Sequence, residues 1–160
     1  MSGRAARAPR GGPADCAFCG IVARPGAGVV FQDEVSLAFL DHRPLRPGHC
    51  LVAPKTHVPT LADLPAALVG PFFLDVQMLA RAVEQALEAD GAFVAINIRV
   101  SQSVPHLHVH VVPRQRGDGL FARDFVWRRQ PYPDEAAARA VAERIRAAVQ
   151  QLTGSEPGEG

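Results

Sequence analysis

The chain of 160 residues lacks several features that would assign it to a special class of protein. It holds no run of apolar residues close to the roughly 18 that a membrane-spanning helix needs. Its first fourteen residues carry three arginines but no apolar stretch behind them, unlike a secretory signal. A formal net charge of +1 is not the basic excess of a nucleic-acid-binding surface. We therefore predict neither a membrane nor a nucleic acid as a partner.

Cysteine is scarce as well. Three cysteines in a chain of this size do not provide the disulfide framework of a small secreted domain, so we expect free thiols and a cytoplasmic location. Cys16 and Cys19 form a C-x-x-C pair. By itself this pair fits a redox couple, half of a zinc site or two buried thiols, and its spacing does not choose between them.

The composition provides enough apolar material for one domain, since 48% of the residues are hydrophobic. We predict a disordered arm at residues 1–14 and a disordered tail at residues 153–160, because both are poor in apolar residues. The domain then spans residues 15–152. Its charges cancel, because the arm carries the positive excess and the tail two glutamates.

The hydrophobic pattern predicts an α+β domain with a mainly antiparallel sheet of about five strands. A long helix is predicted within residues 61–90, with Asp63 as its cap and Pro71 as a kink or its true start. A C-terminal helix is predicted at residues 134–152 and a short helical turn at residues 18–24. The strands are predicted at residues 29–32, 35–40, 49–53, 92–98 and 105–112.

Half of the six histidines lie within five residues, in a segment that reads H-L-H-V-H-V-V from residue 106 to residue 112. Side chains in a strand alternate between its two faces, so His106, His108 and His110 share one face and the apolar residues between them the other. A random chain of this composition contains such a pattern with an expectation of roughly 0.01. A polar face that is histidine by accident is therefore disfavoured.

Two chemical interpretations remain open from these residues alone. Three imidazoles on one face can bind a metal ion, as histidine clusters do in zinc enzymes. Alternatively, a neutral imidazole can attack phosphorus near pH 7 and pass the phosphoryl or nucleotidyl group to an acceptor. The second chemistry needs one ring nitrogen free to attack and the other N–H anchored to an acceptor. Neighbouring imidazoles then donate hydrogen bonds to phosphate oxygens.

The surroundings of the three histidines favour chemistry at phosphorus. Small polar residues and turn amides at residues 101–104 can hold a phosphate group. Downstream of the histidines, arginines outnumber acidic residues and form a basic rim suited to steering an anionic substrate. The arginines of this rim are Arg114, Arg116, Arg123, Arg128 and Arg129.

The H-L-H-V-H-V-V segment resembles the signature of the histidine triad (HIT) superfamily of nucleotide hydrolases and transferases. Three further stretches extend the resemblance over residues 16–114. Residues 16–19 resemble the C-x-F-C of many bacterial members, and residues 29–41 resemble the first hairpin of the family. Residues 47–57, P-G-H-C-L-V-A-P-K-T-H, resemble its G-H-x-L-V-x-P-K-x-H strand. The resemblance implies the HIT-like fold.

The resemblance also implies catalytic roles. His108, the middle histidine, is the expected nucleophile that becomes nucleotidylated, and His110 is expected to contact the phosphate. His106 is expected to organise the hydrogen bonds behind them, together with His49. Ser103 is expected to assist protonation of the leaving group.

The same resemblance implies how a nucleotide is held. Asp41 aligns with the residue that binds the ribose hydroxyls, and Asn97 with a polar position near the phosphate. The phosphate-binding loop corresponds to Ser101, Gln102, Ser103 and Val104, with His110 beside it. Apolar residues of the first hairpin are expected either to enclose the base or to belong to the core; they are Phe31, Phe39 and Leu40.

One stretch departs from the family pattern. The family reads N-x-G-x-x-x-G-Q-S/T-V-x-H between its fourth and fifth strands, whereas residues 97–106 read N-I-R-V-S-Q-S-V-P-H. Both glycines are absent and two residues are missing, and Ser101 replaces the glycine whose N–H faces the phosphate. Either the backbone freedom of glycine is not needed here or the loop turns differently.

The resemblance suggests a structural zinc site as well, because some bacterial members hold zinc with the C-x-x-C pair and two histidines. The matching residues are Cys16, Cys19, His57 and His106, and two thiolates with two imidazoles suit tetrahedral Zn²⁺. No cofactor is expected to be required for catalysis. Family members also form two-fold dimers through the long helix and the fourth strand, so we expect a homodimer.

The predicted activity is hydrolysis of nucleoside phosphate conjugates through a nucleotidyl-histidine intermediate, releasing a nucleoside monophosphate. The conjugates include dinucleoside polyphosphates, nucleoside phosphoramidates and adenylates. Three alternatives stay open: a phosphorylase or nucleotidyltransferase, a nucleotide-binding protein with vestigial activity, and a metal-dependent enzyme that uses the three histidines.

Overall fold

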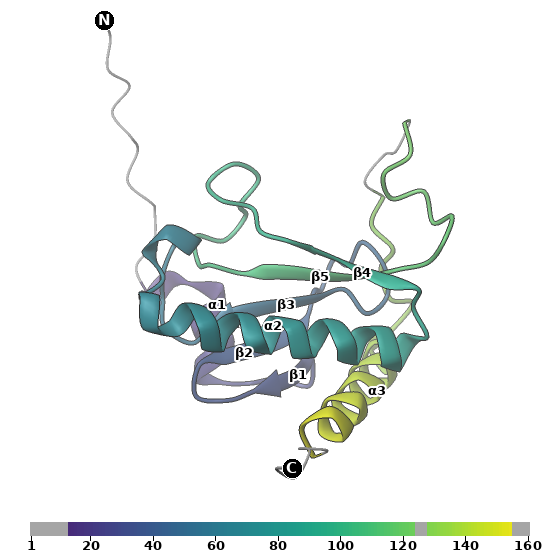
Figure 1. Cartoon of the computed structure of the whole chain (residues 1–160), viewed down its shortest axis with the longest axis horizontal. Coiled ribbons are helices and arrows are strands. Elements are labelled where there is room, and N and C mark those ends of the chain that lie inside the picture. Colours follow the sequence, from purple (N-terminus) through teal and green to yellow (C-terminus); the bar gives the residue numbers. More distant parts are fainter. Residues whose placement is uncertain (1–12, 124–127, 155–160) are drawn as a thin grey trace, which may run out of the picture.

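A computed structural model of the chain describes residues 13–123 and 128–154, and their backbone forms one five-stranded antiparallel sheet with three α-helices (Figure 1). The strand order is β1-β2-β3-β5-β4, and each strand pairs antiparallel with its neighbours. The strands are β1 (Val29–Gln32), β2 (Ser36–Leu40), β3 (Cys50–Pro54), β4 (Gly91–Ala95) and β5 (Val109–Arg114). The helices are α1 (Ala17–Ala23), α2 (Ala66–Leu87) and α3 (Glu135–Gly154), with 3-10 turns at Pro13–Asp15 and Leu61–Asp63. The predicted α+β class is confirmed.

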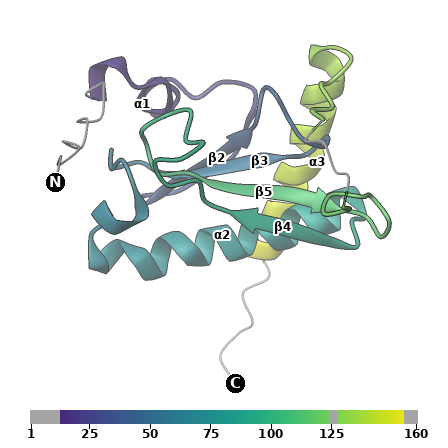
Figure 2. The same ribbon diagram turned by 90° about the horizontal axis from the view of Figure 1, so that it is seen from above.

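The sheet separates two apolar layers (Figure 2). Helices α2 and α3 pack on one face, where buried residues such as Ala38 and Val52 meet them. Helix α1 lies on the opposite face, and its Phe18 packs there against Leu37, Phe39 and Leu51. Strands β2 and β3 are thus covered on both faces, which explains their unbroken apolar sequences.

Helix α2 buries one side against the sheet through residues at helical spacing: Phe72, Val76, Leu79, Ala82 and Val83. Of the two alternatives predicted for Pro71, the structure excludes the one in which it marks the start, because Pro71 lies inside the helix. The predicted cap of the helix differs as well. Asp63 belongs to the 3-10 turn before the helix, a turn whose N-cap is Thr60, and the Asp63 carboxylate accepts hydrogen bonds from the Thr60 N–H and hydroxyl at 3.1 and 2.7 Å.

Helix α2 bears on the sequence expectation about membrane spans. This helix is long and apolar enough, by length and composition, to cross a membrane. Core helices pass the same test, and five residues of α2 are buried inside the molecule. The helix is therefore weak support for a membrane location.

The strands that flank the site are shorter than predicted. Strand β4 ends at Ala95 rather than at residue 98, and β5 begins at Val109 rather than at residue 105. Pro105 has no N–H for a strand ladder, and the N–H of Leu107 donates instead to the Val58 carbonyl at 2.7 Å. Residues 96–108 therefore form a loop. The predicted arm and tail fall largely outside the described residues, although α3 continues through residues 153 and 154.

Gly48 fixes the turn that leads into β3. Its φ is +91°, and an added Cβ would lie 2.0 Å from Cδ1 of Leu87. Its N–H donates to the hydroxyl of Tyr132 at 2.8 Å. The turn thus requires glycine, and it places the next residue, His49, beneath the site.

Candidate active site

The three clustered histidines lie on the α1 face of the sheet, as the alternation predicts. The Phe18 ring contacts the rings of His106 and His108, with centroids 5.9 and 5.1 Å apart. His110 pairs with Leu51 of β3 on one side and Ala95 of β4 on the other. The apolar residues between them, Leu107 and Val109, belong to the core on the opposite face. The alternation therefore holds although β5 begins only after His108.

The hydrogen bond of His108 determines which of its nitrogens is reactive. Its Nδ1 lies 2.7 Å from the carbonyl oxygen of His106. A carbonyl oxygen only accepts, so Nδ1 carries the proton. Burial lowers the pKa of His108 below its ordinary value, although the His106 carbonyl and Asp41 oppose this shift. The ring is therefore neutral at physiological pH, with a lone pair on Nε2.

That lone pair is accessible although the His108 side chain is only 3% exposed. Within residues 13–123 and 128–154, no side-chain nitrogen or oxygen is both shielded from solvent and without a hydrogen bond. The His108 ring makes its hydrogen bond through Nδ1. Nε2 therefore reaches the molecular surface, where a substrate atom can meet it.

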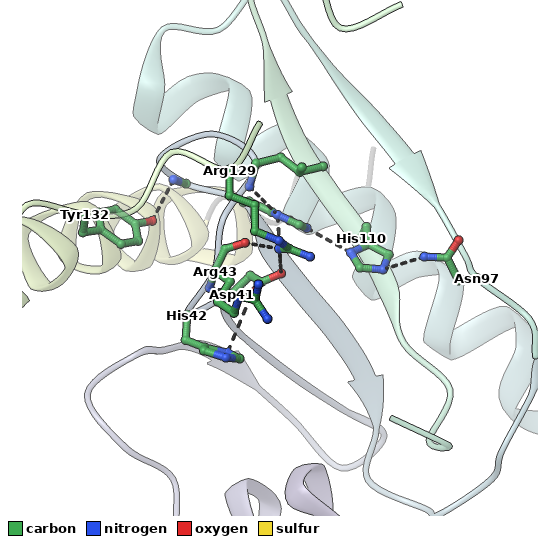
Figure 3. Close-up of polar contacts among 10 residues, drawn as sticks. Asp41, His42, Arg43, Asn97, His110, Arg129 and Tyr132 are labelled. Carbon is green, nitrogen blue, oxygen red and sulfur yellow. Dashed lines mark hydrogen bonds and ion pairs between the residues drawn. The ribbon is translucent and has the colours of Figure 1, made fainter. Parts of the chain in front are cut away.

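A second chain of hydrogen bonds sets the protons of His49 and His110 (Figure 3). The N–H of Leu45 donates to Nδ1 of His49 at 3.1 Å, so the proton of this ring is on Nε2. Nε2 then donates to Nδ1 of His110 at 3.0 Å, and His110 carries its own proton on Nε2. Nε2 lies 3.4 Å from the Asn97 amide. We assign the amide oxygen to this contact, because the oxygen and nitrogen of an amide are identified by their partners.

Both rings are neutral at physiological pH. Burial lowers the pKa of His49 to about 4, although Asp41 acts in the opposite direction. Burial, followed by the neighbouring His108, lowers the pKa of His110 to about 4. His110 therefore offers one N–H to a ligand. Its contact with Asn97 is longer than the usual 2.7–3.2 Å of a hydrogen bond, which leaves this donor available.

His49, His110 and Asn97 open into a cavity of about 460 Å³, within the range of small-molecule sites, and His108 is not among the described residues that line it. Asp41 stands at one side of it, with Oδ1 accepting the Arg43 N–H at 2.8 Å. The cavity joins elements that are distant in the chain. Its lining residues are Asp41, Leu45, His49, Phe93, Ala95, Asn97, Ser101, His110 and Arg129.

A second cluster lies behind the triad, where Cys16, Cys19, His57 and His106 bring four candidate ligand atoms within 4.8 Å of one another. Nε2 of His106 lies 2.7 Å from the Pro54 carbonyl, so it donates there and leaves the lone pair of Nδ1 facing the thiols. Nδ1 is 3.4 Å from Sγ of Cys16 and 3.6 Å from Sγ of Cys19. Burial, followed by the neighbouring Cys16, raises the pKa of the Cys19 thiol to about 11.

This donor set fits zinc. Two thiols and two imidazoles are the ligands of a closed tetrahedral site, and the remaining N–H of His106 is bound to a carbonyl in the manner of zinc-ligating histidines. Among the described residues, no candidate metal group contains all three histidines of the triad. That geometry disfavours the interpretation in which the triplet itself binds a catalytic metal.

The short loop keeps a left-handed backbone without glycine. Arg99 stands two residues after Asn97, at the first glycine of the family pattern, and has a φ of 62°. Ser101, at the second glycine, has a φ of 59°. Such conformations cost a non-glycine residue about 1–2 kcal/mol. The amide of Gln102 holds this shape, accepting the Arg99 N–H at 2.9 Å and donating to the Pro59 carbonyl at 2.7 Å.

The other residues of the predicted phosphate-binding loop do not lie together. Ser101 lines the cavity, and Ser103 has an exposed side chain. Val104 packs against the apolar layer under α1. Of the hairpin residues considered for the base, Phe39 lies on this face, whereas Phe31 and Leu40 pack against the core on the other.

Two arginines of the predicted rim lie next to acidic residues. Nε and Nη2 of Arg114 donate to the Asp118 carboxylate at 2.5 and 2.7 Å. Arg116 faces Asp90 at 3.8 Å. Within the described part of the rim, Arg129 is the arginine that lines the cavity. The sequence did not distinguish it from the others.

Three residues that line or cover the site were not predicted from the sequence. Phe93 and Ala95 line the cavity from β4, a position that follows from the pairing of Ala95 with His110. Phe18, the aromatic residue inside the C-x-F-C motif, covers the His108 ring. Its motif was noted, but its contact depends on the placement of α1.

Comparison with known proteins identifies the class. A model of the HIT domain family matches residues 25–117, more than half of the chain. The chain therefore belongs to the HIT family, as the triad motif indicated.

Relatives of this chain include nucleotide hydrolases. Adenylylsulfatase HINT3 of Arabidopsis thaliana is 31% identical over 130 residues, which cover 79% of this chain and 66% of that protein. The asymmetrical bis(5'-nucleosyl)-tetraphosphatase of Schizosaccharomyces pombe is 34% identical over 95 residues, covering 58% of this chain and 52% of that one. This chain thus spans two thirds or less of the length of either relative.

Among solved structures, a zinc-bound histidine triad family protein from Mycobacterium smegmatis superposes with a TM-score of 0.77. It is 38% identical in sequence, and the match covers 91% of this chain and 100% of that chain.

The neutral histidines predict how stability depends on pH. His49 and His110 have pKa values lowered to about 4 in the folded chain, against 6.5 as their ordinary value. Asp41 opposes the shift, while Arg129 and His108 add to it. Between these values the unfolded chain binds more protons, so the free energy of unfolding falls with decreasing pH, by up to about 1.4 kcal/mol per unit for each histidine. Urea denaturation between pH 7 and pH 4.5 measures this slope.

Substitution of His110 by glutamine is expected to reduce the slope. His42→Gln is the matched control, because the side chain of His42 is 88% exposed. Equal slopes for the wild-type protein and His110→Gln would contradict the assignment of a buried neutral ring.

Proposed function

We propose that this HIT protein hydrolyses nucleoside phosphate conjugates, with Nε2 of His108 as the nucleophile. The observation that carries the proposal is the hydrogen bond from Nδ1 of His108 to the His106 carbonyl at 2.7 Å. It fixes a neutral ring whose lone pair points away from the anchoring carbonyl. This is the state that an imidazole needs for attack on phosphorus.

In the first step, the Nε2 lone pair attacks the α-phosphorus. A P–N bond forms, the bond from phosphorus to the leaving group breaks, and the leaving group takes up a proton. The ring of His108 becomes cationic while Nδ1–H stays on the His106 carbonyl, which stabilises the positive charge. The neutral starting state thus gains a stronger hydrogen bond as the reaction proceeds.

In the second step, water attacks the same phosphorus and the P–N bond breaks. The nucleoside monophosphate leaves, Nε2 recovers its lone pair, and the proton of the water passes to the solvent. The Nε2–H of His110 is suited to a phosphate oxygen, because its partner in the free protein is the distant amide of Asn97. Ser101 at the cavity wall is placed to add a further donor.

The remaining roles follow the family pattern. Asp41 is proposed to hold the ribose hydroxyls, and residues 102–104 to approach the phosphate through their backbone, with Ser103 protonating the leaving group. The names of the two relatives support the substrate class, since an adenylylsulfatase and a tetraphosphatase both cleave at nucleotide phosphates. In the alternative phosphorylase or transferase, phosphate or another acceptor replaces water in the second step. The last alternative is a nucleotide-binding protein with vestigial activity.

We propose in addition that Cys16, Cys19, His57 and His106 hold a structural zinc ion. The ion would supply the positive charge that favours the thiolate form of its cysteine ligands. It would also fix the ring of His106, the residue whose backbone carbonyl accepts the hydrogen bond from His108. The zinc-bound relative supports this assignment. Because all three cysteines are free thiols, a reducing cytoplasmic location belongs to the same proposal.

The expected homodimer has a suitable surface. Strand β4 is an edge strand, and its Val94 is 44% exposed. On α2, Val69 and Leu74 are 38% and 65% exposed. We propose that these two elements form the interface with a second copy, which extends the sheet and covers the apolar side chains.

The nucleophile is tested by replacing His108 with alanine. We expect turnover of diadenosine polyphosphates, adenosine phosphoramidate and adenylyl sulfate to fall by at least about a thousandfold. Intact-mass analysis of quenched reactions should show an adenylyl adduct on the wild-type protein and none on His108→Ala. His42→Ala, which removes an exposed histidine, is the control.

Two results would overturn this function. Activity that survives His108→Ala but disappears with a chelator would indicate a metal-dependent enzyme. A wild-type protein that forms no adduct and turns over nothing in the panel would indicate a binding protein. Comparison of products with and without inorganic phosphate separates hydrolysis from phosphorolysis.

Zinc is tested by the metal content of the purified protein. We expect zinc in the wild-type protein and its loss in Cys19→Ser, with a lower Tm, because the remaining donors no longer close a tetrahedral site. Cys50→Ala is the matched control, since Cys50 lies in the other core and belongs to no candidate metal group of the described residues. Equal zinc content in Cys19→Ser and the wild-type protein would refute the site.

The dimer is tested by light scattering during size-exclusion chromatography. Leu74→Glu should convert a dimer to monomers, because the interface would bury an unpaired carboxylate. Val100→Glu, at a side chain 80% exposed in the loop after β4, should leave the dimer intact. A monomeric wild-type protein would exclude the proposed assembly.

A further inference from the structure

The phosphate of the proposed substrate brings negative charge into the cavity. The histidines that line the cavity carry no full positive charge to balance it. His49 and His110 line it as neutral rings at physiological pH, because burial lowers the pKa of both to about 4. Asp41 brings a carboxylate to the same wall. Among the described lining residues, the guanidinium of Arg129 is the one permanent cation.

Arg129 is held in place by contacts of the residues that follow it in the chain. The N–H of Gln130 donates to the Pro44 carbonyl at 2.8 Å, and the Tyr132 hydroxyl accepts the N–H of Gly48 at 2.8 Å. Figure 3 shows the Arg129 side chain extending over Asp41 toward His110. Its charge lies near enough to lower the pKa of both rings.

The guanidinium retains unused hydrogen-bonding capacity. Nη1 donates to the Arg43 carbonyl, and its separation from Oδ2 of Asp41 is 3.9 Å, too long for a hydrogen bond. Arg114 of the same rim shows the contrast, because Asp118 engages it through two short hydrogen bonds. A guanidinium has five N–H donors, and two parallel ones match a phosphate group.

We propose that Arg129 is a substrate-binding residue that supplies the positive charge for the phosphate of the bound nucleotide. The phosphate lies between the Arg129 guanidinium and the His110 Nε2–H, and the loose contact with Asp41 leaves that carboxylate for the ribose. The inference rests on the proposed function for the identity of the anion as a nucleotide phosphate. Arg129 comes from the segment before α3, whereas the other residues of the site come from the sheet and its loops.

The test separates a contact with phosphate from a structural role. Calorimetry measures the Kd of adenosine 5'-monophosphate and of adenosine for the wild-type protein, Arg129→Gln and Arg129→Lys. The ratio of the two affinities reports the contribution of the phosphate alone. We expect this ratio to fall about 10- to 100-fold in Arg129→Gln, while adenosine affinity stays near that of the wild-type protein. Arg129→Lys should restore part of the ratio, because it keeps the charge but not the paired donors.

Arg144→Gln is the control for the change in net charge, since Arg144 lies on α3 away from this cavity. A parallel loss of both affinities in Arg129→Gln would show a structural role and overturn the inference. A wild-type protein that binds the monophosphate no better than adenosine would overturn it as well. These measurements need no turnover. If the ratio of the two affinities falls in Arg129→Gln but no His108 adduct forms, the result supports Arg129 as a phosphate ligand and refutes the proposed hydrolysis.

Discussion

The hydrogen bond from Nδ1 of His108 to the carbonyl oxygen of His106 is the constraint on which the site depends. It selects one tautomer of a buried ring and leaves the reactive lone pair on the opposite nitrogen. The carbonyl is itself positioned from behind, because Nε2 of His106 donates to the Pro54 carbonyl and Nδ1 faces the thiols of α1. The thiols of the C-x-x-C pair thus contact the residue whose carbonyl anchors the His108 ring.

A neutral triad has a consequence for charge. Burial keeps the imidazoles uncharged, which preserves the nucleophile but leaves the phosphate without a cation from the histidines. The arginine-rich segment after β5 compensates at one place. Among the described arginines of this segment, Arg114 is paired with Asp118 and Arg116 faces Asp90, and Arg129 is the one that lines the cavity. A chain of nearly zero net charge thus places one positive charge where we propose that the anion binds.

The sequence predicted the histidine face correctly, because alternation in an extended segment depends only on local geometry. The same reasoning wrongly placed His106 and His108 inside the fifth strand, which begins only at Val109. Before that point the N–H of Leu107 donates to the distant Val58 carbonyl instead of to a neighbouring strand, and the local sequence does not reveal this contact. The glycine-less loop was equally beyond local rules: Arg99 and Ser101 keep left-handed backbones, and Gln102 holds them by bonding to Pro59. The position of Arg129 over Asp41 required the tertiary fold.

The most direct test of this account is the protonation state of His108, measured by the ¹⁵N chemical shifts of its imidazole at pH 7. Spectra of His108→Ala assign the signals. The account predicts a neutral ring with the proton on Nδ1 and a bare Nε2, and it predicts that substrate forms its phosphorus bond at Nε2. A proton on Nε2, or a doubly protonated ring at pH 7, would contradict it.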